Sequence, residues 1–171
     1  MGIRVEKGGL LTTIQDCGRY GVQKFGVNVS GAMDMRSMKI ANILVGNNPE
    51  EGVLEATILG PKLVFTTDTV FAVTGGDLGL QVNGIPAPTY RALQAKANDI
   101  IDYVQLKSGC RAYIAFAGGL DIPYVFGSKS TNLRSAFGGY KGRALRAGDY
   151  LEFLQPGQIL RNLEKRHVQA E

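Results

Sequence analysis

The sequence has no tryptophan, one histidine, two cysteines and no long hydrophobic run. Zinc binding is not expected, because Cys17, Cys110 and His167 stand far apart and structural zinc sites need clustered ligands. The position of His167 near the C-terminus also disfavours a Ser–His–Asp triad. If the chain is catalytic, carboxylates must therefore act as the general acid or base. No stretch approaches the length of a membrane span, and residues 1–9 lack the apolar core of a signal peptide. We therefore expect a cytoplasmic protein without membrane contact, with reduced thiols and Cys110 buried in a strand.

Glycine, in contrast, is abundant, with 23 of 171 residues, and hydrophobic residues make up 44%. A chain of this length and composition suits one folded domain with many tight turns between short strands. The net charge of +4 is modest, and no nucleic-acid-binding signature accompanies it. The charge favours small anionic molecules or an acidic protein as binding partners.

The hydrophobic pattern predicts one helix and many strands. Residues Asp34 to Val45 carry apolar side chains at helical spacing, with Ser30 or Asp34 as the cap and Gly46 as the end. Asn83-Gly84 is a hairpin turn signal. Alternating segments at intervals of about 8–12 residues indicate a sandwich or barrel. The expected strands are 3–7, 10–15, 53–59, 62–65, 70–74, 78–82, 91–93, 100–106, 111–116 and 150–154.

Two glycine-rich segments, 9–34 and 117–143, carry the side chains best suited to a site. Glycine lets the backbone turn sharply or approach a ligand, and polar residues on such loops commonly bind or react. The second segment is too long for a simple hairpin loop, and loops of that length are commonly functional. Its apolar residues, such as Leu120 and Phe137, predict that it is ordered.

Several short motifs stand out along the chain. They begin at Leu11 (LTTIQDCGR), Val29 (VSGAMD), Ala41 (ANILVGN), Leu54 (LEAT), Gly60 (GP), Thr74 (TGGD), Ala117 (AGG), Gly127 (GSKST), Phe137 (FGG) and Ala147 (AGDYL). Taken together, these motifs resemble one family. The chain is similar to the C-subunit proteins of bacterial 5-oxoprolinase, also called KipA-like or allophanate hydrolase subunit 2, and to the biotin-dependent carboxyltransferase part of urea carboxylase. The resemblance spans roughly residues 5–154 and keeps the family's order.

The resemblance implies a mainly β fold, a cyclophilin-like β-barrel with one principal α-helix, over residues 1–156, followed by a charged C-terminal tail over 157–171. Family members are usually about twice this length, with a second barrel-like half. Lys129 stands where the family commonly has arginine, which a lysine cannot replace as a bidentate anion ligand.

The function implied is that of a component of an ATP-dependent 5-oxoprolinase, a hydrolase that opens the cyclic amide of 5-oxoproline to glutamate. The implied partners are a KipI-like B subunit and a LamB/YcsF-like A subunit, with homo-oligomers as a further option. We expect no cofactor or metal on this chain. The resemblance implies that the complex uses ATP, and because this chain shows no P-loop motif, we expect a partner to bind the nucleotide.

Two alternatives stay open. One is a urea or allophanate carboxyltransferase- or hydrolase-type subunit, for which biotin would be carried on another domain, since this chain has no Met-Lys-Met motif. The other is a non-catalytic KipA-like regulator that binds a kinase-inhibitor partner. No residue in the sequence discriminates the lactam from urea.

Twelve residues are the site candidates. The predicted catalytic residues are Asp16, Ser30 and Asp34, and the predicted substrate-binding residues are Gln15, Arg19, Gln23, Asp77, Ser128, Ser130, Thr131, Arg134 and Arg143. Each has a structural alternative: a loop ion pair for Asp16 and Arg19, helix capping for Ser30 and Asp34, a strand-end turn for Asp77, and hydrogen bonds within the loops or solvent exposure for the others.

Overall fold

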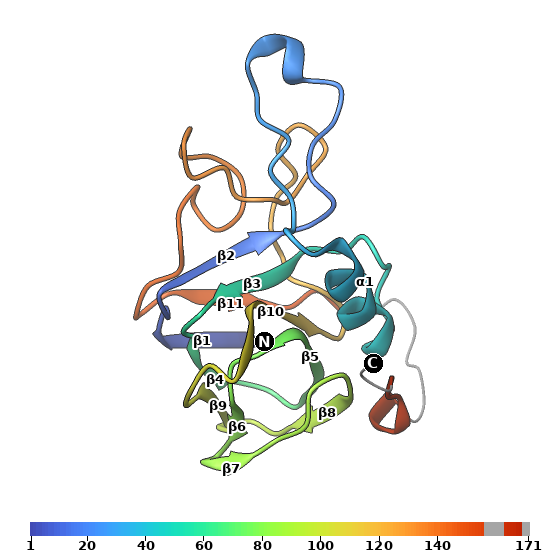
Figure 1. Ribbon diagram of the computed structural model, residues 1–171, viewed down its shortest axis with the longest axis vertical. Helices are drawn as coiled ribbons and strands as arrows, with labels where there is room; N and C mark the ends of the chain where they lie inside the picture. Colours follow the sequence, from blue (N-terminus) through green and yellow to red (C-terminus); the bar gives the residue numbers. More distant parts are fainter. Residues whose placement is uncertain (156–162, 169–171) are drawn as a thin grey trace.

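Two antiparallel β-sheets pack face to face in the computed structural model, which describes residues 1–155 and 163–168 (Figure 1). The first sheet has the strand order β11-β1-β4-β9-β6-β7, and the second has the order β2-β3-β10-β5-β8. The predicted mainly β fold with one principal helix is confirmed. The strands are β1 (Gly2–Lys7), β2 (Leu11–Gln15), β3 (Val53–Thr57), β4 (Lys62–Phe65), β5 (Thr69–Asp77), β6 (Leu80–Val82), β7 (Ile85–Pro86), β8 (Ala92–Ala95), β9 (Ile100–Tyr103), β10 (Ser108–Phe116) and β11 (Tyr150–Glu152).

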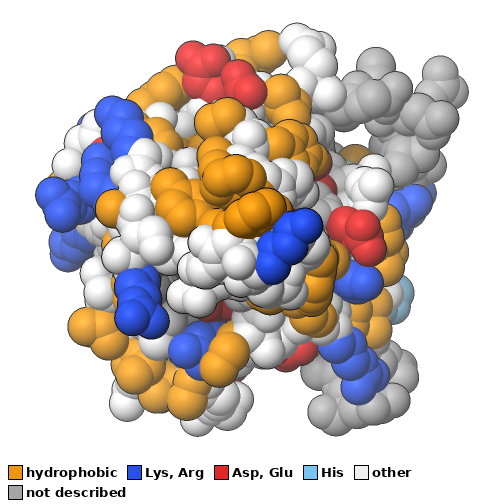
Figure 2. Space-filling model, turned by 90° about the horizontal axis from the view of Figure 1, so that it is seen from above, with side chains coloured by type: hydrophobic (Ala, Val, Ile, Leu, Met, Phe, Trp, Pro, Cys, Tyr) orange, Lys and Arg blue, Asp and Glu red, His pale blue; other side chains and the backbone are white. Residues whose placement is uncertain are grey.

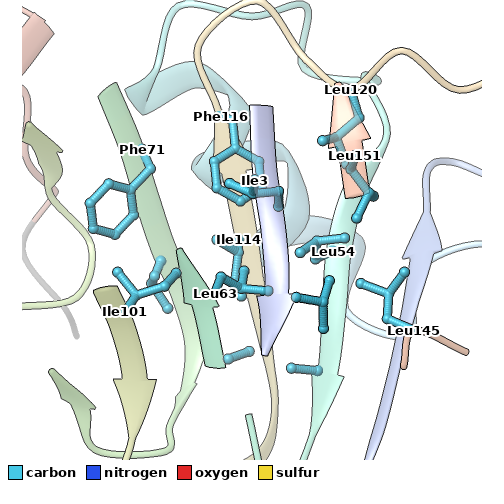
Figure 3. Packing of buried hydrophobic residues seen from close by; sticks show 14 of the residues in the cluster. Ile3, Leu54, Leu63, Phe71, Ile101, Ile114, Phe116, Leu120, Leu145 and Leu151 are labelled. Carbon is cyan, nitrogen blue, oxygen red and sulfur yellow. The ribbon is translucent and has the colours of Figure 1, made fainter. Parts of the chain in front are cut away.

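The main core lies between the two sheets. Ile3 and Leu63 extend from the first sheet toward Leu54 and Ile114 of the second (Figure 3). Successive side chains of a strand point to opposite faces, so each strand contributes every second residue to this core. Leu120 joins it from a loop, which ties the long segment after β10 to the barrel.

The opposite face of the second sheet is covered by helix α1 (Met35–Leu44). Tyr113 and Ala115 of β10 point toward the helix, while their neighbours point to the main core. The helix buries Met38 and Ala41, which lie three residues apart on one face. This second cluster fixes the start of α1 against the sheet, directly after the loop that carries Asp16.

Local turn chemistry explains several connections. Asn83 and Gly84 both have positive φ, 51° and 79°, as a two-residue hairpin turn between β6 and β7 requires. The free edge of β2 is covered by later chain: the backbone N–H of Thr131 donates to Ile14 O, and that of Leu145 to Thr12 O, both at 2.9 Å. The 120–145 segment is therefore bound to the barrel along this edge.

The tail was predicted to be separate from the core. Residues 156–162 and 169–171 lie outside the described residues, so the division at 156 stays a prediction. Within the described part, Leu163 packs against the helix-side cluster, and His167 forms a bridge with Arg91 beside β8. This stretch thus covers the edge of the second sheet.

One burial prediction was wrong: Cys110 is exposed. The pairing of β10 with β3 begins only at Arg111, and its register with β5 shifts between Ser108 and Ala112. The start of β10 is therefore irregularly paired, and Cys110 lies at the surface there.

Candidate functional site

The polar residues of the site meet at one end of the barrel, where β2 ends. From there the 16–34 segment rises away from the sheets and carries the short 3-10 helix η1 (Gln23–Phe25), and the 120–145 segment runs beside its base (Figure 1). A single carboxylate, Asp16, joins the two segments.

Asp16 is 5% exposed, and its carboxylate accepts hydrogen bonds on both oxygens. Its Oδ1 atom receives the hydroxyls of Ser128 at 2.7 Å and Ser130 at 2.5 Å, and also the backbone N–H of Gly18 at 2.7 Å. Its Oδ2 atom receives the backbone N–H of Lys129 at 2.6 Å. Hydrogen bonds to an ionised group are stronger than neutral ones, so this carboxylate fixes the Ser128–Ser130 turn against the end of β2.

Arg19 makes the second connection between the two segments. Its side chain is 1% exposed and donates from Nε to Val125 O at 3.3 Å, from Nη1 to Ser30 Oγ at 3.0 Å, and from Nη2 to Ser130 O. The guanidinium also lies 4.9 Å from the centre of the Phe137 ring. Burial lowers the pKa of Arg19 from its ordinary value, an effect that the attraction of Asp16 opposes.

Gln15 and Thr131 complete the buried network. Gln15 Nε2 donates to Thr13 Oγ1 at 2.9 Å and to Thr131 O at 3.4 Å, and its Oε1 accepts from Gly31 N at 3.1 Å. Thr131 Oγ1 accepts from Ile14 N at 3.2 Å. The structure therefore brings together seven predicted site residues: Gln15, Asp16, Arg19, Ser30, Ser128, Ser130 and Thr131.

Sequence reasoning missed the buried ion pair beside this network. Lys129 Nζ donates to Glu51 Oε1 at 2.5 Å and to Leu120 O at 2.9 Å, and it lies 5.2 Å from the centre of the Tyr124 ring. Lys129 is 2% exposed. The unusual lysine in the Gly-Ser-Lys-Ser-Thr motif was the available signal, but Glu51 lies far away in the sequence and has no motif of its own.

A small polar cavity of about 190 Å³ adjoins the network and the ion pair. Its lining combines the start of the first loop, the turn after α1 and the second loop: Asp16, Cys17, Gly18, Asn48, Glu50, Glu51, Tyr124 and Gly127. Burial raises the pKa of the Cys17 thiol, which disfavours a thiolate nucleophile. Because its lining includes carboxylates, the cavity favours ligands that donate N–H hydrogen bonds over anionic ligands.

Three of the remaining candidates lie away from the network. Asp34 caps α1, because its Oδ1 accepts from Ser37 N at 3.0 Å and its Oδ2 from Ser37 Oγ at 2.5 Å. Gln23 is exposed on η1, and Arg134 is exposed on the turn of residues 133–136. These three do not join the Asp16 group, so their predicted roles at a site stay predictions.

The last two candidates have partners of their own. The strand register places Asp77 at the end of the second sheet where β2 begins, opposite to the end that Asp16 follows, and Asp77 accepts from Gly79 N at 2.8 Å. Arg143 forms a two-pronged pair with Asp149, with both N–O distances 2.7 Å. The guanidinium of Arg143 is therefore paired with a carboxylate of its own, and its predicted substrate-binding role stays a prediction.

Metal binding has no obvious location in the described part of the chain. Among residues 1–155 and 163–168, no group of three or more His, Cys, Asp and Glu side chains could hold a metal ion. Within the same residues, no helix has the length and apolar character needed to cross a membrane.

The fold and the loop-borne polar site define a carboxyltransferase-type domain. The sequence model of the family described as "Carboxyltransferase domain, subdomain A and B" matches residues 25–170, and the chain belongs to this family. The resemblance stated from the motifs is thereby confirmed.

Curated relatives include enzymes of two kinds. The chain is 41% identical to the urea amidolyase of Lachancea kluyveri over 86% of its length, which is 8% of that protein. It is 38% identical to the 5-oxoprolinase C subunit of Escherichia coli over 87% of its length, which is 48% of that protein. The chain thus spans about half of the C subunit that it matches and a small part of the amidolyase.

Solved structures agree with this relationship. The urea carboxylase of Kluyveromyces lactis superposes with a TM-score of 0.86 at 42% identity, covering 91% of this chain and 14% of that one. The protein TTHA0988 superposes with a TM-score of 0.87 at 31% identity, covering 99% of this chain and 33% of that one.

Proposed function

We propose that this chain is a C-subunit-type component of an ATP-dependent 5-oxoprolinase, which hydrolyses the cyclic amide of 5-oxoproline to glutamate. The observation that carries the proposal is the match to the 5-oxoprolinase C subunit of Escherichia coli, 38% identical over 87% of the chain. The C subunit of Haemophilus influenzae is similarly related, at 37% identity over 82%. Those relatives are subunits by name, so the proposed activity belongs to an assembly with the A and B subunits.

The geometry suggests how the chain contributes. Asp16 and Arg19 hold the two loops in one arrangement. The hydroxyls of Ser128 and Ser130 donate to Asp16, and the hydroxyl of Ser30 accepts from Arg19. We propose that the network positions the wall of the 190 Å³ cavity. Substrate would then contact the cavity wall, and the nucleotide would be bound by a partner protein of the assembly.

A second candidate is a role in urea or allophanate chemistry. The acidic wall of the cavity, with Glu50 and Glu51, favours it, because urea is neutral and offers N–H donors whereas 5-oxoproline carries a carboxylate. In this case biotin would be presented by another domain. A purely regulatory, KipA-like role would require neither substrate.

The deciding experiment mixes the chain with its candidate A and B subunits and ATP, and omits each protein in turn. We expect glutamate to form from 5-oxoproline and formation to stop when this chain is left out. A parallel mixture with urea and a biotinylated carrier domain tests the second candidate. Complex formation without turnover of either substrate would overturn both and favour the regulator.

A further inference from the structure

Two loop segments at one end of the molecule combine exposed aromatic side chains with charge of a single sign. Segments 17–33 and 122–148 contain no Asp or Glu, although they contain seven Lys and Arg residues. Seen from above, apolar side chains gather at the centre of this end, with Lys and Arg around them and Asp or Glu side chains farther out (Figure 2). We call the exposed side chains of Tyr20, Lys24, Phe25, Phe126, Leu133 and Arg134 the tip surface.

The base of the tip surface, which carries Phe126, is held in place rather than formed by a loose loop. Arg19 donates to Val125 O and to Ser130 O, so that the two segments are joined beneath the tip. The Phe126 ring packs edge-on against Phe137, with their centroids 5.9 Å apart. A surface already ordered in this way loses little conformational entropy when it binds.

The exposure of the tip residues requires an explanation. Phe25 is 73% exposed, Tyr20 66% and Phe126 57%, whereas the phenylalanines of β4, β5 and β10 are fully buried in the core. Large aromatic residues together with arginine, and few acidic residues, form the composition typical of a protein–protein interface. Exposed apolar groups of this kind mark interaction sites.

We propose that the tip surface docks a different protein chain, one that presents Asp and Glu around an apolar centre. Charge selects this occupant, because the exposed charges of the tip, Lys24 and Arg134, are both positive. A second copy of the same chain would bring these charges against their own kind, which opposes a symmetric contact. An anionic membrane is disfavoured, because so few cations give only about 1 kcal/mol of attraction each.

The test uses the KipI-like B subunit as the probe, a choice that rests on the proposed function. Binding of the whole chain is measured by calorimetry at low and high salt. We expect Phe25→Ser with Phe126→Ser to weaken binding at least about tenfold by removing apolar contacts. We expect Lys24→Glu with Arg134→Glu to weaken it at low salt and to reduce its salt dependence.

Matched controls lie on the far side of the barrel. Ile85 of β7 is 70% exposed, close to the value for Phe25, and Lys7 is an exposed lysine. Ile85→Ser and Lys7→Glu should bind the B subunit as the wild type does. Thermal unfolding of the charge variants and of both controls should match the wild type, since these side chains are exposed. The single variant Phe25→Ser, which keeps the Phe126–Phe137 contact, separates lost binding from lost stability.

The proposal would be overturned if the wild type did not bind the B subunit, or if the tip variants bound it as well as the wild type does. It would also be overturned by self-association that Phe25→Ser abolishes, or by binding to phosphatidylserine vesicles that depends on the tip residues. Glutamate formation is measured separately in the same mixtures. Turnover that survives in the tip variants with unchanged affinity would refute the docking surface and leave the proposed function intact. Binding of the B subunit that depends on the tip surface, without glutamate formation, would support the docking surface and refute the proposed function.

Discussion

At the scale of single residues, Arg19 connects the two loops of the site through hydrogen bonds and a ring contact. It bonds three oxygen atoms and stacks on Phe137, and only a planar guanidinium can make all of these contacts. We expect Arg19→Lys to lower the free energy of unfolding by about 1.5–3 kcal/mol, the range for hydrogen bonds to charged groups. Urea denaturation measures this change.

The matched control for that substitution is Arg134→Lys, which alters an exposed arginine. It should change the free energy of unfolding by less than about 0.5 kcal/mol. Equal effects of the two substitutions would show that the contacts of Arg19 contribute nothing specific.

Buried Lys129 and partly exposed Glu51 form an ion pair whose members depend on each other. Lys129→Met leaves the Glu51 carboxylate without its cation, so we expect the free energy of unfolding to fall by about 1–3 kcal/mol. Adding Glu51→Gln removes the stranded charge and should restore part of that loss. A double-mutant cycle by urea denaturation checks the coupling, and strictly additive losses would contradict it.

At the scale of elements, Asp34 begins α1, and two substitutions separate its capping role from a catalytic one. Asparagine is also a good cap, so Asp34→Asn should preserve stability, whereas Asp34→Ala should cost about 1 kcal/mol. Because both carboxylate oxygens bind Ser37, we expect glutamate formation to survive Asp34→Asn. Loss of turnover in a stable Asp34→Asn variant would instead support the catalytic role predicted from the sequence.

The turn before β11 makes stability depend on pH. Hydrogen bonds from Arg143 lower the pKa of Asp149, although burial opposes them. A carboxyl group with a lowered folded pKa stabilises the fold above its unfolded pKa of about 3.9 and loses this contribution as pH falls through the folded value. We expect wild-type stability to fall below about pH 4 more steeply than that of Asp149→Asn. Parallel pH profiles in denaturation experiments would contradict this role.

The elements themselves were largely predictable from local sequence. The helix expected over residues 34–45 is α1 with its two caps, and Asn83-Gly84 forms its hairpin, because spacing and turn chemistry act over short distances. Strand ends were less predictable: β5 extends to Asp77, beyond the expected end at Thr74. The end of β5 is set by its pairing with β10, and the periodicity of the sequence carries no information about strand pairing.

At the scale of the whole molecule, the sequence indicated two polar loops but not where their side chains meet. Asp16 and the Ser128–Ser130 turn were both candidates, and folding brings them together across more than a hundred residues. Asp77 has equally suitable chemistry but belongs to the opposite end of the sheet. Which polar residues converge is fixed by strand order and register, which one sequence does not reveal.

The central claim is that the Asp16 network builds the working end of a 5-oxoprolinase component. Glutamate formation from 5-oxoproline, with ATP and the A and B subunits, tests it directly when wild type and Asp16→Asn are compared. The substitution would turn one acceptor into a donor facing the Ser128–Ser130 turn and displace the cavity wall. We predict glutamate formation by the wild-type mixture and a rate about 10- to 100-fold lower for the folded variant. Equal rates, or no glutamate from the wild-type mixture, would contradict the claim.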